Sequence, residues 1–300
     1  MADIFVCADA IIGAATIRQV VNSDHQTNQE IRKAMVSGGN AVTQVSGKAS
    51  AEMTSFSSGD IAALLALNSN TFIAAGKSEL SSTITIPYKL RQNAGSFQAA
   101  ASNHPWITGS NALIVPVSVE ASQDADFASM QCEVHWLSTD GITQGATEAT
   151  GQTLATQSFN SEFALSDVYI NGSAVPGVQS VRCTTGIEVV KPPLGSGSVF
   201  PKQASIKNII PTIEITTNDI AAVTATVGAF TAMTSAVVYF RKRSDAGVYV
   251  AKATAGHCSL TFGAGLADSS SVSVSNNEDG TCTIVLHGKT LTASAATAIP

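Results

Sequence analysis

The stretch Asp60-Ile61-Ala62-Ala63 occurs a second time as Asp219-Ile220-Ala221-Ala222, at an offset of 219 − 60 = 159 residues. Each copy follows a polar run with strand-like alternation and precedes an apolar run. Further identities at the same offset are Gln44 with Gln203, Ser46 with Ser205 and Lys48 with Lys207. A period of this length in a chain of 300 residues indicates two copies of one domain.

The similarity extends in both directions when small gaps are allowed. Phe5, Asp9 and Ile12 match Phe163, Asp167 and Ile170, while Lys89, Arg91, Phe97, His104 and Cys132 match Arg241, Arg243, Tyr249, His257 and Cys282. Pairing Gly13 and Arg18 with Gly177 and Arg182 predicts an insertion in the second copy, at Asn171 to Pro176. We therefore expect a duplication with domains at 1–155 and 156–300. The alternative is chance similarity between two β-rich halves.

The composition indicates a polar surface with few charges. Charged residues make up 13% of the chain, about half the usual share of soluble proteins, and the net charge is −6. A sequence-independent nucleic-acid binder needs a basic face, so this class is disfavoured. Such a surface suits contact between copies of the chain, or a passage through which a polymer slides.

The cysteines and the longest uncharged run each have a simple interpretation. Five cysteines without a CxxC pair predict buried free thiols, as at Cys7, Cys132 and Cys282, and the N-terminus lacks a signal-peptide pattern. The run from Ile220 to Phe240 is uncharged, but its counterpart from Ile61 to Tyr88 carries charges and a proline. We therefore expect no membrane span.

Alternating patterns and turn residues predict an antiparallel β protein. The expected strands include Phe5 to Ile12, Val42 to Ser57, Thr83 to Leu90, Ser96 to Ala101, Leu113 to Glu120, Cys132 to Leu137, Phe163 to Ile170, Val178 to Thr184 and Gln203 to Thr217. Asn171-Gly172 predicts a hairpin turn, and Pro211 predicts a bulge or an edge position. Ser58 or Asp60, and Asn218 or Asp219, are good N-caps for short helices. The predicted fold class is mainly β, with two tandem β-sandwich or barrel-like domains and one short α-helix in each.

The two halves differ most in a long segment between strands. It is Asn22 to Asn40 in the first half and Gly186 to Pro201 in the second. Segments of this length are usually functional or mobile. We expect them to be projecting arms that reach a neighbouring subunit, the alternative being surface loops. The candidate subunit-contact and ring-stacking residues are His25, Glu30, Arg32, Lys33, Lys191, Pro192, Pro193 and Phe200.

Motifs for catalysis or cofactor binding are missing from the sequence. There is no P-loop, dinucleotide fingerprint, HExxH or G-x-S-x-G, so we predict no enzyme and no cofactor. His257, Cys258, Cys282 and His287 are possible ligands by residue type, but their spacing matches no common metal site. We expect satisfied histidines and buried thiols there, and no metal.

Two further groups leave alternatives open. The basic clusters Lys89-Arg91 and Arg241-Lys242-Arg243 could line a subunit contact or touch phosphates, or they could guard a solvated strand edge. Trp136 alternates with Val134 and is expected in the core. The sequence does not decide whether Trp106 lies in the core or on the surface, where it could stack on a sugar.

Several of these motifs resemble one family. The run from Val168 to Val178, which contains Asn171-Gly172 and Pro176-Gly177, resembles the opening hairpin of tail tube proteins of long-tailed, siphovirus-like bacteriophages. Gly195 to Pro201 resembles the end of their long loop, and Thr217 to Ile220 resembles the start of their helix. The resemblance is best over residues 163–225 and reaches the first half through the repeat. The first-half segment Asn22 to Asn40 lacks the Pro-Pro and Phe-Pro features.

The resemblance implies a structural virion protein of the tail, made in the host cytoplasm. Proteins of this family form hexameric rings whose inner sheets join into one β-barrel, and the rings stack into a tube. The tube holds the tape-measure protein, later passes DNA, and meets other tail proteins at its ends. With two copies in one chain, we expect homotrimeric, pseudo-hexameric rings. The alternatives are a tail-tip hub, terminator or adaptor ring of the same fold, or a sugar-binding β-sandwich module.

Overall fold

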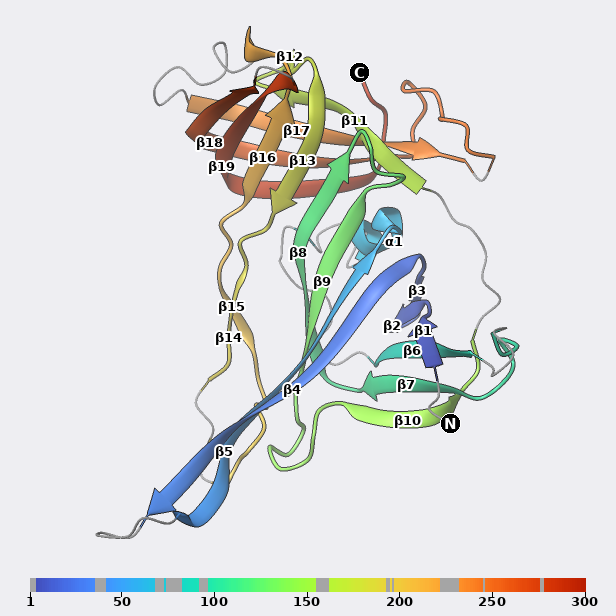
Figure 1. The fold of residues 1–300 in the computed structure, drawn as a ribbon, viewed down its shortest axis with the longest axis vertical. Coiled ribbons are helices and arrows are strands. Elements are labelled where there is room, and N and C mark those ends of the chain that lie inside the picture. The colour runs from blue at the N-terminus through green and yellow to red at the C-terminus, as the bar shows by residue number, and fades with distance from the viewer. Residues whose placement is uncertain are drawn as a thin grey trace.

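The computed structural model describes residues 4–35, 42–67, 73, 83–91, 97–154, 162–192, 195, 197–221, 232–244, 246–275 and 278–300. The chain is mainly β with large antiparallel sheets, as predicted (Figure 1). The N-terminal half contains β1 (Ile4–Cys7), β2 (Ala10–Ile12), β3 (Ala15–Ile17), β4 (Val20–Met35), β5 (Val42–Ser58), α1 (Ile61–Ala66), β6 (Ile84–Arg91), β7 (His104–Gly109), β8 (Ala112–Ser122), β9 (Ser129–Trp136) and β10 (Thr147–Gln152). The C-terminal half contains β11 (Glu162–Ile170), β12 (Ser173–Ala174), β13 (Val178–Thr184), β14 (Glu188–Val190), β15 (Ser205–Asn208), β16 (Thr212–Thr217), β17 (Ala232–Arg243), β18 (His257–Ser275) and β19 (Glu278–Thr297).

Two layers of strands form the N-terminal half. One layer has the order β10-β7-β6-β2-β3, with β1 also paired to β6. The other has the order β8-β9-β5-β4. Alternating residues of β9, namely Met130, Cys132, Val134 and Trp136, are buried in the core. The layers enclose apolar side chains, and α1 adds Ile61, Leu64 and Leu65 to this core.

The C-terminal half repeats this strand order, but two long strands run through both layers. The first part of β18 pairs with β17 and with the end of β19, giving the order β19-β18-β17-β11-β12. The second part of β18 pairs with the start of β19, giving β18-β19-β16-β13. In the N-terminal half, interruptions after Gly109 and Trp136 divide the corresponding strands into β7 and β8, and into β9 and β10.

Hydrogen bonds outside the regular strand pairs also recur in the two halves. In each pair the donor and the acceptor occupy corresponding places: Gly13 N to Thr83 O and Asn171 N to Ser235 O; Gly59 N to Gln19 O and Asn218 N to Gly177 O; Ser102 N to Ala99 O and Thr254 N to Ala251 O; Leu154 N to Ala100 O and Ile299 N to Lys252 O. A cation–π contact recurs as well, with Lys89 over Phe97 and Arg241 over Tyr249.

The insertion expected at Asn171 to Pro176 is wrong. Gln19 and Gly177 both have positive φ, 52° and 63°, and each accepts the same hydrogen bond at the start of the next strand. Gln19 therefore corresponds to Gly177, and the β11–β12 hairpin at Asn171 corresponds to the β2–β3 hairpin at Gly13. The identity between Arg18 and Arg182 was coincidental, because the backbone conformation rather than the side chain defines the position.

Other strand predictions hold in part. Val42 to Ser57 is confirmed as β5, and Asn171-Gly172 forms the predicted turn. The segment from Gln203 to Thr217 divides into β15 and β16 on either side of Pro211, and Phe5 to Ile12 divides into β1 and β2. No named strand spans the described part of Ser96 to Ala101, so that prediction is wrong. The expected second helix falls mostly on 222–231, outside the described residues.

The cap of α1 is also a link between elements. Asp60 is 1% exposed and accepts hydrogen bonds from Ala63 N, at 3.3 Å, and from Arg18 N, at 3.1 Å. Asp219 is half-buried, and its carboxylate accepts a hydrogen bond from Ala221 N at 2.8 Å. We expect Asp60→Ala to lower the free energy of unfolding by about 2 kcal/mol, at the upper end for a lost cap. Asp219→Ala, the matched control, should cost less than about 1 kcal/mol. Urea unfolding followed by circular dichroism measures both, and equal losses would contradict the expectation.

Candidate subunit-contact surfaces

The two halves are joined edge to edge within one continuous sheet. Strand β8 of the N-terminal half pairs antiparallel with β13 of the C-terminal half, with Ser122, Glu120 and Ser118 opposite Ser180, Arg182 and Thr184. The outcome is an eleven-stranded sheet that includes strands of both halves (Figure 1). On the side of the junction that faces the core, burial is nearly complete, since Val119 and Cys183, which lie opposite each other, are 1% and 2% exposed.

The turn between β8 and β9 reinforces the junction. Ala128 N donates to Phe163 O at 2.6 Å, and Gln123 N donates to Gln179 O at 2.8 Å. The Arg243 guanidinium pairs with the Glu162 carboxylate and also donates to Asp126 O. The junction therefore includes the strand pair, a turn and a half-buried ion pair.

At the place where the other half uses its edge for the junction, each half has an edge that pairs with no further described strand. Comparing the strand orders of the two halves identifies these edges. Strand β4, which corresponds to β13, pairs with β5 alone among the described strands, and residues 267–275 of β18, which correspond to β8, pair only with β19. On the second edge Val272 and Val274 are 48% and 73% exposed. In the N-terminal half, Val119 lies opposite Met130. Val274 lies next to Gly280, which takes the place of Met130 in the C-terminal half, so Val274 is the counterpart of the buried Val119.

A cleft of about 520 Å³ lies beside the free edge of β4. Its lining consists of Ser23, Asp24, His25, Tyr88, Pro105, Trp106, Ile107, Glu148, Ala149 and Thr150. The counterparts of Ser23, His25 and Tyr88 in the other half are Val181, Cys183 and Phe240, which are fully buried. The difference follows from the junction, because β8 covers that side of the C-terminal half and no described strand covers β4.

Two hydrogen bonds connect His25, which lines this cleft, with Trp136 in the core. Trp136 Nε1 donates to the Thr54 hydroxyl at 2.8 Å, and that hydroxyl lies 2.8 Å from His25 Nδ1. The Thr54 hydroxyl therefore connects the buried Trp136 indole to the His25 ring. Tyr88, half-buried and in contact with Ser23, has its pKa raised by burial.

Both long segments are projecting β ribbons, as expected. Arm 1 comprises residues 26–35 of β4 and 42–51 of β5, beyond Glu52, where pairing of β5 with β9 ends. Arm 2 is the described part of 186–208, with the β14–β15 pair at its centre. Figure 1 shows both ribbons running toward the lower end of the molecule, with arm 1 reaching furthest.

The structure places the candidate contact residues on these ribbons and at their bases. His25 lies at the base of arm 1, and Glu30, Arg32 and Lys33 lie along it. Lys191, Pro192 and Phe200 belong to arm 2, and Pro193 lies outside the described residues. The two sets are not brought together, because the arms leave different halves of the sheet.

Lys191 contacts the N-terminal half of its own chain. Its pKa is lowered by burial, and the nearby carboxylates of Glu52 and Glu133 oppose that shift. Glu52 is fully buried and accepts from Gly145 N and Ala146 N, while Glu133 pairs with His135 at 3.3 Å. The ammonium group is therefore close enough to two carboxylates of the N-terminal half to interact with their charge. Its position indicates a contact inside the chain rather than with a neighbour.

Arm 2 docks on the turn at residues 138–143, which we call the docking turn. Gly141 O accepts from Val199 N at 2.8 Å and from Phe200 N at 3.0 Å, and Ser138 N donates to Pro201 O at 2.8 Å. Asp140 shapes the turn, since its carboxylate accepts from the backbone and hydroxyl of Thr143, from Ile142 N and from the Ser138 hydroxyl. These bonds hold the pKa of Asp140 well below its usual range.

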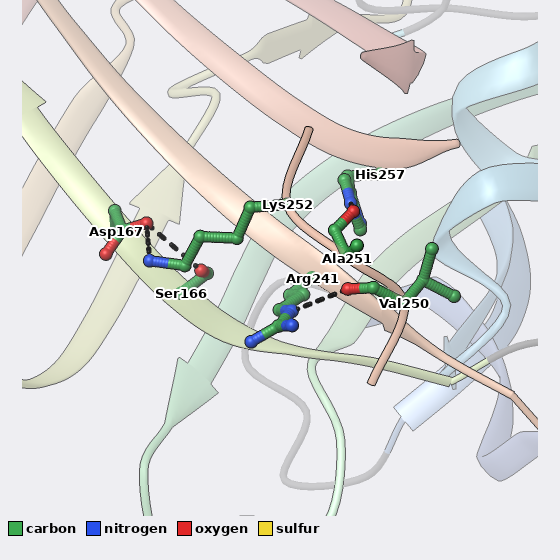
Figure 2. Close-up of polar contacts among 7 residues, drawn as sticks. All are labelled: Ser166, Asp167, Arg241, Val250, Ala251, Lys252 and His257. Carbon is green, nitrogen blue, oxygen red and sulfur yellow. Dashed lines mark hydrogen bonds and ion pairs between the residues drawn. The ribbon is translucent and has the colours of Figure 1, made fainter. Parts of the chain in front are cut away.

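Two side chains of the basic cluster, Arg241 and Arg243, make contacts within the chain, and Figure 2 shows the surroundings of Arg241. Arg241 donates to Val250 O at 2.8 Å and stacks on Tyr249, and Lys252 pairs with Asp167 at 2.5 Å. His257 accepts from Lys242 N at Nδ1, so its Nε2 carries the proton and donates to Ala251 O. Both ring nitrogens are satisfied, as expected for a core histidine.

The cysteines are free, and four of them are buried. Cys132, Cys183, Cys258 and Cys282 lie in the core, and burial raises the pKa of Cys132, Cys183 and Cys258. Cys7 is half-buried, so its predicted full burial is wrong. Among the described residues no group of three potential ligands is close enough to hold a metal ion.

The sheet face turned away from the core is rich in hydroxyl groups around the junction. Arg182 lies in a cross-strand row between Glu120 and Glu214 and pairs with Glu120 at 3.0 Å. Ser180, Thr184, Thr212 and Thr216 share this face by strand alternation. The row carries one positive and two negative side chains, so it offers little attraction to a polyanion.

Comparison with known proteins identifies no relative. No family matches the chain, and no curated protein matches it. Within the described residues no helix is long and apolar enough to cross a bilayer.

Proposed function

We propose that this chain is a structural virion protein that forms trimeric, pseudo-hexameric rings stacked into a phage tail tube. The β8–β13 junction carries the proposal. It joins two sandwiches of the same strand order edge to edge. The strands that correspond to β13 and β8 in the other copy, namely β4 and residues 267–275 of β18, remain unpaired at this kind of edge among the described strands. Residues 267–275 of one chain pairing with β4 of the next would repeat the internal junction.

The matched contacts support a duplicated domain. Recurring hairpins, hydrogen bonds and cation–π pairs are expected when two copies of one gene segment diverge, and they are improbable between unrelated β folds. With two equivalent units per chain, three chains supply six units, and closing the ring would pair the free edge of β4 with that of residues 267–275 of β18 in the next chain. The hydroxyl-rich face around Glu120 and Arg182 suits a conduit for the tape-measure protein and for DNA, which should not adhere to it.

The alternatives make different predictions. A tail-tip hub, terminator or adaptor would form a single ring with no rods, whereas a tube protein polymerises. A sugar-binding module would use the cleft at Trp106 in a monomer. The buried counterpart of this cleft in the C-terminal half favours filling by a neighbouring chain instead.

Cysteine pairing tests the proposed junction directly. Thr184 and Ser118 lie opposite each other across the internal junction. Gln26 corresponds to Thr184, and Ser273 corresponds to Ser118. In assembled protein, Gln26→Cys with Ser273→Cys should form intermolecular disulfides, because directly opposed residues lie within disulfide range. The control pair, Gln26→Cys with Ser269→Cys, is out of register by four residues, about 13 Å.

Non-reducing gels and electron microscopy provide the measurements. Covalent trimers from the first pair only, together with rods that have three chains per layer, are the expected result. A chain that stays monomeric at high concentration would contradict the proposed function. Rods in which only the control pair cross-links would contradict the register.

A further inference from the structure

The two arms meet different surroundings within the same chain. Arm 2 is held against the N-terminal half by the docking turn and by Lys191, through three backbone hydrogen bonds and a half-buried ammonium group. Arm 1 pairs only within its own ribbon among the described strands. An isolated two-stranded ribbon is at best marginally stable in water. Arm 1 is therefore a segment that requires a partner.

Among the described residues of the C-terminal half, no turn corresponds to the docking turn. In the N-terminal half, β9 ends at Trp136 and β10 begins at Thr147, and the docking turn lies between them. In the C-terminal half this place is occupied by continuous strand β19, where His287, Gly288 and Thr290 pair with Leu266, Gly265 and Gly263 of β18. Because β19 continues as a strand here, it forms no turn in which one carbonyl, like that of Gly141, accepts hydrogen bonds from two successive residues of an arm.

This asymmetry decides what arm 1 can contact in a ring. At a chain-to-chain junction, arm 1 of one chain would meet the C-terminal half of the next, as arm 2 meets the N-terminal half within a chain. Because that half offers no docking turn, arm 1 cannot be held in the plane of the ring by the contacts that hold arm 2. It remains free to leave the ring.

Charge indicates which surface arm 1 would bind. Residues 26–51 contain Arg32, Lys33, Lys48 and one acidic residue, Glu30, a net charge of +2 in a chain of net −6. The remainder of the chain therefore carries −8. A basic ribbon that projects from an acidic molecule is complementary to other copies of that molecule.

We infer that arm 1 is the ring-to-ring contact, binding a second copy of this chain in the adjacent ring, whereas arm 2 clamps the two halves of its own chain. This inference rests on the proposed function. It means that each ring extends three stacking arms rather than six. The segment with the family-like Pro-Pro and Phe-Pro features is thus the clamp, and the divergent segment makes the stacking contact.

Shortening arm 1 tests the inference. Gln29 and Ser50 are paired, so residues 30–49 can be replaced by Asn-Gly, which forms a two-residue hairpin turn. The shortened chain should form trimeric rings but no rods, as seen by electron microscopy and sedimentation velocity. Ring formation itself reports that the shortened chain is folded.

A second variant keeps the length of the arm and reverses its charge. Arg32→Glu with Lys33→Glu should raise the concentration needed for rods at least tenfold while leaving trimers intact, and added salt should weaken wild-type stacking. The matched control, Lys202→Glu in arm 2, should leave that concentration within twofold of wild type.

The outcomes separate the two proposals. Wild-type protein that forms neither rings nor rods would overturn the proposed function. Wild-type rods together with rods of normal length from the shortened variant would overturn the inference about arm 1 and leave the proposed function standing. Unchanged assembly of the charge-reversed variant would contradict the electrostatic part.

Discussion

A Val274→Asp chain should fold normally and fail to assemble. Val274 is 73% exposed on the free edge of β18, so a carboxylate there is solvated in the single chain. In the proposed ring the same side chain takes the position of Val119, which is 1% exposed at the internal junction. Burying an unpaired carboxylate costs several kcal/mol, and each 1.4 kcal/mol is a factor of ten in association. We expect association to weaken at least a hundredfold, measured by sedimentation velocity.

The matched control makes the same change on the other side of the repeat. Val119→Asp introduces the carboxylate into a junction that the chain must bury in order to fold, so this variant should lose more than about 4 kcal/mol of stability. Circular dichroism and urea unfolding distinguish the two variants. Val274→Asp assembling like wild type, or destabilising the monomer as much as Val119→Asp does, would contradict the equivalence of the two edges.

The tryptophans provide the second large effect. Trp136 is 1% exposed, contacts the core and donates to the Thr54 hydroxyl at 2.8 Å. Trp136→Ala should lower the free energy of unfolding by about 3–5 kcal/mol, as expected for truncating a large buried aromatic side chain. The loss includes the hydrogen bond that fixes Thr54, and therefore the position of His25.

Trp106→Ala is the control for this variant. Trp106 is half-buried at the cleft beside β4, so its truncation should cost no more than about 1 kcal/mol in the single chain. Both free energies are measured by urea unfolding at concentrations where the chain is monomeric, because assembly adds apparent stability. A larger loss at Trp106 would show that the cleft is part of the chain's own core.

Local sequence patterns were sufficient for much of the fold. Alternation of apolar and polar residues located β5 and β9, because one face of each strand is buried, and Asn171-Gly172 located its turn because both residues accept positive φ. The repeat around Asp60 indicated which segments correspond. It failed at Arg18, where the matching feature is a backbone conformation shared by a glutamine and a glycine.

The features that define the contact surfaces could not be predicted from the sequence. Pairing of β8 with β13 joins residues about sixty apart, and no local pattern specifies which two sheet edges meet. The docking turn depends on Asp140 bonding its own neighbours, and its significance appears only beside arm 2. Arg32 and Lys33 lie on a ribbon formed by β4 and β5, whereas Lys191 is half-buried near the carboxylates of Glu52 and Glu133, a proximity that no local pattern indicates.

The docking turn also has a consequence for long-range order. If only every second unit of a ring extends a stacking arm, a ring can be added to the growing end in three equivalent orientations, 120° apart, instead of six. The helical lattice of such a tube would then have three starts, and averaging images at 60° intervals would blur density at the arms. The short loop between Trp136 and Thr147 would thus set the rotational symmetry of the entire filament.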